Sequence, residues 1–586
     1  MGFQIPARIV STKHIMLRGC RNLRAAESAI NSWRLVVLFG RRHYASTSSA
    51  WRNNNGDDKM HQWQSKRKRW RHPVKQTIKK VLSSSSNNKS KETNATSSKP
   101  KQDQHHARYT KPKSQQFQAP FSAFISCLPG LEPLLLQEVK YLQSHWLSLN
   151  DSIASKIGNG HPHILRGGVK LTIPSVHHLY ILHLYMGTAS HIYLRLNDDN
   201  FEGLPPLFRA RGFPELQRKV KDLIISQRWD EWLTGSGSSG HSEKEHSLVN
   251  VQVHVTTSKS KLMHTKAIEE RLKQSIGELI PNIASSDNNE AAATTAKTIR
   301  LMARIDRDVV QLSLDSSLVP LHRRGYRLKP HKAPLREDLA YALLMSGGLM
   351  PRWDLRPHFS NNNSDESIAR VDSLSPSSRE TNRVLFDPCC GSGTIAIEGA
   401  SMQLGLPPGR FHPPPLECTT FYNPALWEEM KSKAQSVPFS SAKQDDNPVY
   451  VAAGDIDAKA LDAAKANAKR AGVDDCIDFV KGSFVSHPLL KQQSKDGKKS
   501  NVLDASQQSL LVVANPPYGK RSSPDETKNT TYRKLARVLL SSSRSIDCAM
   551  IGKDLRVMRE AGIPSLDVIF STKHGGLNVV AMAGRL

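Results

Sequence analysis

The segment VLFDPCCGSGTIAIEGA, residues 384–400, is the part of the sequence that most narrows the fold. Its first three residues are apolar and indicate a buried strand, and its last residues indicate a helix. Between them, Gly391 and Gly393 allow a tight turn whose backbone can approach a ligand, at a helix N-terminus that favours anionic groups. A third glycine at the dinucleotide-binding position is missing, which argues against an NAD site. The segment therefore predicts a nucleoside-binding strand–turn–helix unit.

A second predicted strand, residues 449–453, is followed by the acids Asp455 and Asp457 and by an alanine-rich helical run from Ala458. An acid at the end of the second strand of such a fold can accept hydrogen bonds from both ribose hydroxyls. We therefore expect Asp455 to bind ribose and Asp457 to cap the helix. The alternative is that both acids serve only as N-caps.

A third predicted strand, residues 510–514, leads into the sequence NPPYG at 515–519. The two prolines end the strand and hold an irregular loop at the carboxyl end of the sheet, where such folds bind ligands. The Asn515 amide oxygen and a neighbouring backbone carbonyl can accept both hydrogens of an exocyclic amine, which orients the nitrogen lone pair toward an electrophilic methyl group. Tyr518 can stack on the base. The alternative, a bare turn, is disfavoured by the two upstream units.

Two regions of the sequence show different patterns of predicted secondary structure. Residues 333–586 alternate strands and helices, which predicts a parallel α/β sheet. Residues 119–328 predict an α+β module. Its expected strands are 121–126, 249–255, 299–305 and 309–314, and its expected helices begin near Gly130 and Thr265.

The charge of the 586-residue chain is concentrated near its N-terminus. The formal net charge is +29, from 82 Lys and Arg against 53 Asp and Glu. Residues 1–118 hold 25 basic and 5 acidic residues, a surplus of +20, which leaves +9 for the other 468 residues. A large basic surplus indicates nucleic acid or another anionic partner but does not identify a fold.

The first 118 residues resemble a leader followed by a linker. Residues 1–44 are rich in Arg and contain the single acid Glu27, a composition typical of an organellar transit peptide, and we expect a mitochondrial rather than a plastid address. The alternatives are a plain basic leader and a nuclear or cytoplasmic protein. Residues 45–118 predict a disordered basic linker. Within it, the run KRKRWR at 66–71 suits an RNA-binding arm, a nuclear localisation signal or a solvated basic segment equally well.

Membrane spans and cysteine modules are both disfavoured. No apolar run approaches the roughly 18–20 residues that a transmembrane helix needs. The seven cysteines lack Cys-x-x-Cys spacing, so we expect neither a disulfide scaffold nor a zinc module, and a reducing compartment fits best.

Together these motifs resemble a known family. Residues 387–398 and 515–518 are similar to motifs I and IV of the class I, S-adenosylmethionine (SAM)-dependent amino-methyltransferases. Residues 314–339 are similar to the linker between a THUMP RNA-binding domain and the methyltransferase of the bacterial large-subunit rRNA guanine-N2 methyltransferases. Short segments at 129–132, 167–169, 195–196 and 258–265 resemble that family's ferredoxin-like and THUMP parts.

The resemblance implies a Rossmann-like class I domain with a mostly parallel seven-stranded sheet, preceded by a ferredoxin-like and THUMP module. It implies SAM as cofactor, RNA as partner, and direct methyl transfer to guanine N2 without a metal or a covalent intermediate. The implied catalytic residues are Asn515, Pro516, Pro517 and Tyr518. The implied cofactor-binding residues are Asp387, Pro388, Cys390, Gly391, Ser392, Gly393, Thr394, Asp455, Ile456 and Ser483.

The chain departs from the family pattern in three places. Cys389 replaces a larger apolar residue, which we expect to change only packing, and Ser483 stands where an adenine-contacting Asp is common. The fused second methyltransferase of the bacterial family is not expected, since the sequence ends soon after a hairpin predicted at Gly575 and Gly576.

Several functional questions stay open at this point. The RNA is expected to be large-subunit rRNA, with a tRNA guanine as the alternative. The NPPY sequence also serves enzymes that methylate glutamine amides or adenine N6. From a different class, an RNA-binding ribosome-assembly protein with a vestigial catalytic half is the rival. Residues 322–324 and Arg327 suit either phosphate binding or bracing of a domain interface.

Overall fold

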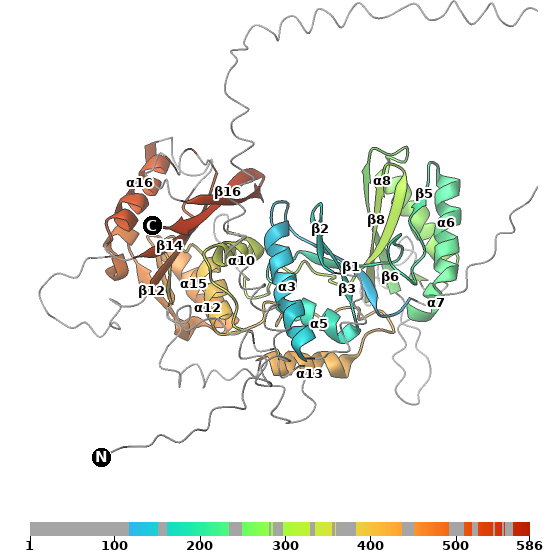
Figure 1. The fold of residues 1–586 in the computed structure, drawn as a ribbon, viewed down its shortest axis with the longest axis horizontal. Coiled ribbons are helices and arrows are strands. Elements are labelled where there is room, and N and C mark those ends of the chain that lie inside the picture. Colours follow the sequence, from blue (N-terminus) through green and yellow to red (C-terminus); the bar gives the residue numbers. More distant parts are fainter. Residues whose placement is uncertain are drawn as a thin grey trace, which may run out of the picture. The chain divides into compact units, whose positions relative to one another are not determined.

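The structure, a computed structural model, describes most of the chain beyond residue 116 (Figure 1). The described residues are 117–149, 161–233, 249–280, 283–284, 297–328, 334–353, 355, 358, 383–435, 451–490, 509–517, 526–542, 545–553, 556, 559 and 566–586. All of them lie in the compact unit formed by residues 112–586. The expected leader, the basic run 66–71 and nearly all of the linker lie outside the described residues. Phe117, which the composition places in the linker, is buried against Trp232 and Phe421.

The first of two sheets contains, among the described residues, nine strands in the order β2-β3-β1-β4-β9-β8-β6-β7, with β5 paired to β9 (Figure 1). Its strands are β1 (Phe121–Ser126), β2 (His163–Leu165), β3 (Gly168–Ile173), β4 (His191–Arg195), β5 (Phe208–Arg209), β6 (Val249–Ser258), β7 (Ile283–Ala284), β8 (Lys297–Asp306) and β9 (Val309–Asp315). The helices along this part are α3 (Glu132–Leu149), α5 (Val176–Tyr185), α6 (Phe213–Ser226), α7 (Trp229–Trp232) and α8 (Thr265–Gly277).

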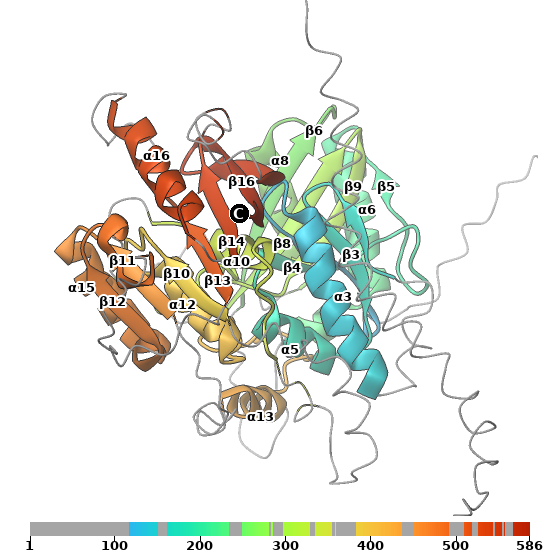
Figure 2. The same ribbon diagram turned by 60° about the vertical axis from the view of Figure 1, so that its left-hand side comes forward.

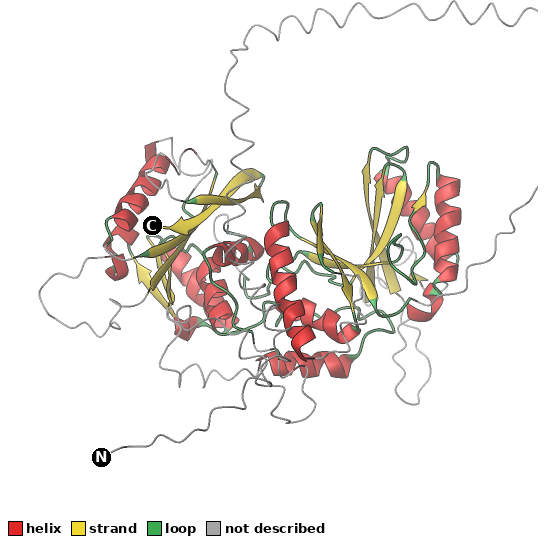
Figure 3. Cartoon of the chain, in the orientation of Figure 1, coloured by secondary structure: helices red, strands yellow, loops and turns green. Residues whose placement is uncertain are grey.

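Helices α3, α5 and α8 pack against this sheet (Figure 3). Strand β6 shows why the residues fold in this way, since Val249, Val251 and Val253 are buried while the residues between them are more exposed. Helix α8 then buries Ile268 and Leu272, four residues apart on one helical face. The predicted strand and the helix that follows it are confirmed.

The two ladders β8–β9 and β4–β9 make the first sheet continuous. Strands β8 and β9 pair antiparallel around a turn in which Arg307 and Asp308 have positive φ angles, which confirms the predicted pair of strands. Strand β9 also pairs antiparallel with β4, with Leu314 opposite Leu194. An α+β module was expected here, and the β4–β9 ladder joins its early and late strands into one sheet.

The second sheet contains, within the described ranges, seven strands in the order β12-β11-β10-β13-β14-β16-β15 (Figure 2). The five strands from β12 to β14 pair in parallel, and the last two join antiparallel, so the predicted mostly parallel seven-stranded sheet is confirmed. Its strands are β10 (Arg383–Asp387), β11 (Val451–Asp455), β12 (Ile477–Lys481), β13 (Ser509–Ala514), β14 (Ile546–Gly552), β15 (Asp567–His574) and β16 (Leu577–Arg585). The helices along this part are α10 (Glu337–Ser346), α12 (Thr394–Gln403), α13 (Pro424–Gln435), α15 (Ala458–Ala471) and α16 (Glu526–Leu540), of which α13 packs against α5.

The central strands of the second sheet contain runs of buried apolar residues. Leu385 and Phe386 of β10 are fully buried, as are Val512 and Val513 of β13. Consecutive buried residues are typical of a parallel sheet with both faces covered, because neighbouring side chains point to opposite faces. Among the described residues, no helix is long and apolar enough to cross a membrane.

Gly409 lies where residues after α12 pack against α5. Its N–H donates to the Leu184 carbonyl at 2.7 Å. A Cβ atom at this glycine would lie far inside van der Waals contact with the His183 carbonyl oxygen, a backbone atom that cannot rotate away. The close approach of two backbones therefore requires glycine at this position.

We expect Gly409→Ala to lower the free energy of unfolding by about 1–3 kcal/mol, because the added methyl overpacks a backbone contact. The matched control is Gly277→Ala at the end of α8, where a Cβ meets no atom within 4 Å. The control should be neutral or stabilising by up to about 1 kcal/mol, since alanine favours helix over glycine. Urea unfolding followed by circular dichroism measures both, and equal stability of the two variants would contradict the packing argument.

Candidate active site

Three adjacent parallel strands end at the same edge of the second sheet. Strand β10 pairs with β11 on one side and with β13 on the other. Asp387 and Asp455 are the last residues of β10 and β11, and Asn515 directly follows β13. Because the chain leaves β10 toward β11 and β12 and later returns to the other side of β10, this edge is a topological switch point, where open α/β sheets bind ligands.

The glycine turn predicted between β10 and α12 is present. Gly391 and Gly393 have φ angles of +54° and +84°, in the left-handed region that favours glycine. The Gly393 N–H donates to the Cys390 carbonyl at 2.8 Å, and the Asn467 side chain on α15 donates to the Ser392 carbonyl at 3.0 Å. At Gly391, a Cβ would meet no atom within 4 Å, so this glycine borders open space.

Asp455 is held by backbone donors. Its Oδ2 accepts from the Gly391 N–H at 2.8 Å and its Oδ1 from the Asp457 N–H at 2.9 Å. Asp457 in turn caps α15, since its side chain accepts from the Lys459 N–H at 3.0 Å. The prediction that Asp457 is the helix cap is confirmed. The carboxylate of Asp455 joins the loops after β10 and β11 and still faces the cavity described below.

Asp387 is fully buried beneath the turn. Its Oδ1 accepts a long hydrogen bond from the Cys389 N–H at 3.3 Å, and no protein partner of its Oδ2 is found among the described residues. Burial, and secondarily the nearby Asp455, raises the pKa of Asp387 from 3.8 to about 8. Asp387 is therefore protonated at neutral pH.

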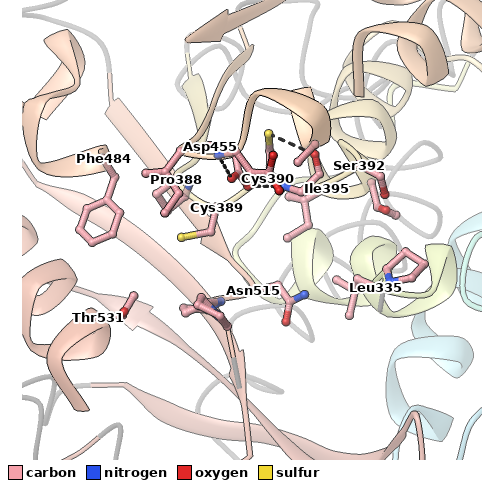
Figure 4. A pocket seen from close by; sticks show the side chains of 18 of the residues that line it. Leu335, Pro388, Cys389, Cys390, Ser392, Ile395, Asp455, Phe484, Asn515 and Thr531 are labelled. Atoms are coloured by element: carbon pink, nitrogen blue, oxygen red, sulfur yellow. Dashed lines mark hydrogen bonds between the residues drawn. The ribbon is translucent and has the colours of Figure 1, made fainter. Parts of the chain in front are cut away.

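A cavity of about 600 Å³ lies over this edge of the sheet (Figure 4). Figure 4 shows Asp455, Cys389 and Asn515 around the same space, with Phe484 and Thr531 on its far side. The sequence-predicted residues that line it are Pro388, Cys390, Gly391, Ser392, Thr394, Asp455, Ile456, Ser483, Asn515, Pro516 and Pro517. Two predicted residues are absent from the lining: Asp387 is buried beneath the turn, and Gly393 is part of the turn itself. Tyr518 lies outside the described residues, so its stacking role stays a prediction.

Other lining residues lie outside the residues predicted to bind cofactor or substrate. Leu335 precedes α10, Lys534 lies on α16, and His574 and Leu577 flank the turn of the β15–β16 hairpin. The hairpin itself was predicted from its glycine pair. Its position over the cavity depends on the antiparallel pairing of β16 with β14, for which the sequence carries no local signal.

The adjacent cysteines are poor nucleophiles in this setting. Cys389 is partly exposed and its side chain points toward the cavity, whereas Cys390 is buried (Figure 4). Burial and the neighbouring acids raise the pKa of both thiols well above the usual range. Both therefore stay protonated at neutral pH, while a nucleophilic cysteine needs the thiolate.

The residues around the cavity fit SAM. The carboxylate of Asp455 can accept hydrogen bonds from ribose hydroxyls, and the open face of Gly391 lets a ligand approach the backbone. Ile456 is 75% exposed although it is apolar, which suits contact with a flat base. The amide oxygen of Asn515 is buried without a protein partner among the described residues. An unpaired buried acceptor is costly unless a ligand supplies a donor.

The fold and this cavity define a class I, SAM-dependent methyltransferase domain. Residues 366–562 match the model of the RMKL-like methyltransferase domain family.

Two curated relatives carry the name ribosomal RNA large subunit methyltransferase K/L. The protein from Syntrophotalea carbinolica is 25% identical over 451 residues, which cover 76% of this chain and 51% of the relative. The protein from Vibrio parahaemolyticus is 32% identical over 224 residues, which cover 38% of this chain and 25% of the relative. The chain thus spans at most about half the length of these relatives.

Solved structures share the fold. A methyltransferase-like protein complexed with S-adenosylhomocysteine (SAH) aligns with a TM-score of 0.56 and 16% identity, covering 80% of this chain and 98% of that protein. A Listeria monocytogenes protein, described as a predicted N6-adenine-specific DNA methylase, aligns with a TM-score of 0.54 and 21% identity. The alignment covers 79% of this chain and 95% of that protein. Among the residues that the structure describes, no three His, Cys, Asp or Glu side chains form a group that could hold a metal ion.

We expect Asp387→Asn to remove a pH dependence of stability. Because the pKa of Asp387 is raised in the folded state, the folded protein binds this proton more tightly than the unfolded chain does. The resulting stabilisation of the wild type is fully present below pH 4 and is lost as the pH rises toward about 8. The stability of the Asn variant relative to the wild type should therefore rise with pH between 4 and 8, by up to about 1.4 kcal/mol per pH unit. Urea unfolding at several pH values measures this difference. A difference that is constant with pH would show that Asp387 is ionised in the folded protein.

Proposed function

We propose that this protein is a SAM-dependent RNA methyltransferase that transfers a methyl group to the exocyclic N2 amine of a guanosine, in large-subunit rRNA. The observation that carries the proposal is the amide oxygen of Asn515, which is buried and has no protein partner within the described part of the chain. Asn515 follows β13 and borders the same cavity as Asp455 and the glycine turn. An acceptor in this position suits an amine donor.

Asn515 aligns the amine in this proposal. Its amide oxygen accepts one N–H of the target amine, which turns the nitrogen lone pair toward the cofactor. Pro516 is buried and Pro517 exposed, and neither carries a backbone N–H that would compete for the Asn515 oxygen. When bound, SAM supplies an electrophilic methyl group. Because that electrophile is already activated, the protein has mainly to position the amine and exclude water.

Asp455 and the turn hold the cofactor in this proposal. The carboxylate of Asp455 accepts from the ribose hydroxyls while the Gly391 N–H fixes its orientation at 2.8 Å. The N-terminus of α12, which starts at Thr394, favours a carboxylate group of the ligand. A target base inside a duplex would have to be flipped into the cavity.

The RNA substrate is supported by the names of the relatives, ribosomal RNA large subunit methyltransferase K/L. The resemblance of residues 129–132, 167–169, 195–196 and 258–265 to ferredoxin-like and THUMP sequences also supports it. Guanine N2 is supported by the resemblance of residues 314–339 to the linker of the guanine-N2 family, while the NPPY motif supports methylation of an exocyclic amine or amide. A tRNA guanine remains the second candidate, and the experiment below distinguishes it.

We expect Asn515→Ala to lower the rate of methyl transfer at least a hundredfold, since the amine is no longer aligned, while SAH affinity changes less than threefold. Asn200→Ala, at an exposed asparagine of the first module, is the matched control and should retain full activity. Mass spectrometry of rRNA and tRNA nucleosides, from cells depleted of the protein and then supplied with each variant, measures the modification.

Each outcome assigns a different role. Loss of N2-methylguanosine from rRNA on depletion, restored by the wild type and not by Asn515→Ala, supports the proposal. Loss from tRNA instead makes tRNA the substrate, and a change in N6-methyladenosine makes adenine the target. If methylation is unchanged when the protein is depleted, the proposed methyltransferase activity is contradicted. The alternative of an RNA-binding ribosome-assembly protein would then be favoured.

We also propose that residues 1–44 direct the protein to mitochondria, on the basis of their arginine-rich, acid-poor composition. Residues 1–118 fused to a fluorescent protein should enter mitochondria. Replacing Arg8, Arg18, Arg21 and Arg24 by Gln should abolish import, because the potential across the inner membrane acts on positive charge. Nuclear or plastid fluorescence of the fusion would contradict this address.

A further inference from the structure

The linker between the two sheets, residues 321–327, packs against the helix that begins at the glycine turn. Tyr326 is buried, and its hydroxyl donates to Glu398 of α12 at 2.9 Å. The Tyr326 carbonyl accepts from Arg470 Nε on α15 at 2.7 Å. The linker is thus bonded to both helices that flank the turn.

Arg324 anchors the other end of the linker. It is 1% exposed and donates to the carbonyls of Gly187 at 2.5 Å and Leu321 at 2.6 Å. Its Nε lies 3.5 Å from Glu398 Oε2. Glu398 therefore receives contacts from two linker residues, and the linker cannot shift without disturbing α12.

Arg327 continues from this anchored linker to the rim of the cavity. Its Nη2 donates to Thr394 Oγ1 at 2.7 Å and to the Leu335 carbonyl at 2.9 Å. Thr394 is the first residue of α12, directly after Gly393, and both Thr394 and Leu335 line the cavity. Glu337 balances the guanidinium charge at 3.3 Å.

Burial strengthens these contacts. The side chain of Arg327 is 13% exposed and that of Glu337 is 8% exposed. A largely desolvated guanidinium forms stronger hydrogen bonds than it does in water. Both hydrogen bonds and the ion pair use the same nitrogen, Nη2, which therefore joins Thr394, Leu335 and Glu337.

We propose that Arg327 is a positioning residue of the cofactor cavity, which sets the first turn of α12 and the Leu335 segment in place through Thr394 Oγ1 and the Leu335 carbonyl. The inference rests on the proposed cofactor of this cavity. The sequence leaves phosphate binding and bracing of a domain interface open for the linker arginines, and the protein partners of Arg327 favour a role that acts through the protein.

The experiment measures SAH binding to the full chain by calorimetry and thermal unfolding without ligand. Arg327→Gln should weaken SAH binding about tenfold, the worth of one charge-assisted hydrogen bond, and Arg327→Lys should weaken it less. Arg323→Gln, at an exposed arginine of the same linker, is the matched control and should bind SAH like the wild type.

Thr394→Val tests whether Arg327 acts through its hydrogen bond to Thr394 Oγ1. If Arg327 acts through Thr394, the two substitutions remove the same contact, so the double variant should bind SAH no more weakly than Arg327→Gln alone.

Wild-type SAH affinity in Arg327→Gln, with a lower unfolding temperature, would overturn the inference and make Arg327 a structural brace only. Additive losses in the double variant would overturn it as well. Both results leave the proposed function intact, whereas a wild-type protein that binds no SAH would contradict the proposed function itself.

Discussion

The site depends on one topological constraint, the parallel pairing of β10 with both β11 and β13. Because the carboxyl ends of parallel strands meet at one edge, Asp455 and Asn515 come together although 60 residues of sequence separate them. The hydrogen bond from the Gly391 N–H to Asp455 closes the loops on the β11 side. On the β13 side the Asn515 oxygen has no such partner among the described residues. The cavity therefore lies between Asp455, whose oxygens accept backbone hydrogen bonds, and Asn515, whose oxygen is available to a ligand.

The motif-bearing units were predictable because their signals are local. Apolar runs, paired glycines and a capping acid each act within a few residues, and β10 extends only one residue beyond the predicted Val384–Phe386 at each end. The alternation of strands and helices likewise predicted the parallel sheet. By contrast, the β4–β9 ladder that unites the first sheet joins segments more than 100 residues apart, and only tertiary packing selects it.

The part of the cavity wall supplied by Leu335, Lys534 and His574 could not be predicted from sequence for the same reason. These residues have no distinctive spacing and reach the cavity only through the placement of α10, α16 and the β15–β16 hairpin. The linker arginines show a second limit. An arginine in a basic sequence suits phosphate or a protein partner equally well, and only its burial and hydrogen bonds decide, as they do for Arg324 and Arg327. The roles of the motif residues toward ligand remain predictions.

The two aspartates that end β10 and β11 have the same side chain but different surroundings at one edge of the sheet. Asp387 is sealed beneath the glycine turn, where burial keeps it protonated at neutral pH, and Asp455 borders the cavity with backbone N–H donors on both oxygens. If both carboxyl groups were ionised, their repulsion would act directly on the turn that they support. A neutral Asp387 avoids that repulsion and leaves Asp455 as the carboxylate available to a ligand. The difference in burial thus separates the two acids, with Asp387 beneath the turn and Asp455 at the cavity.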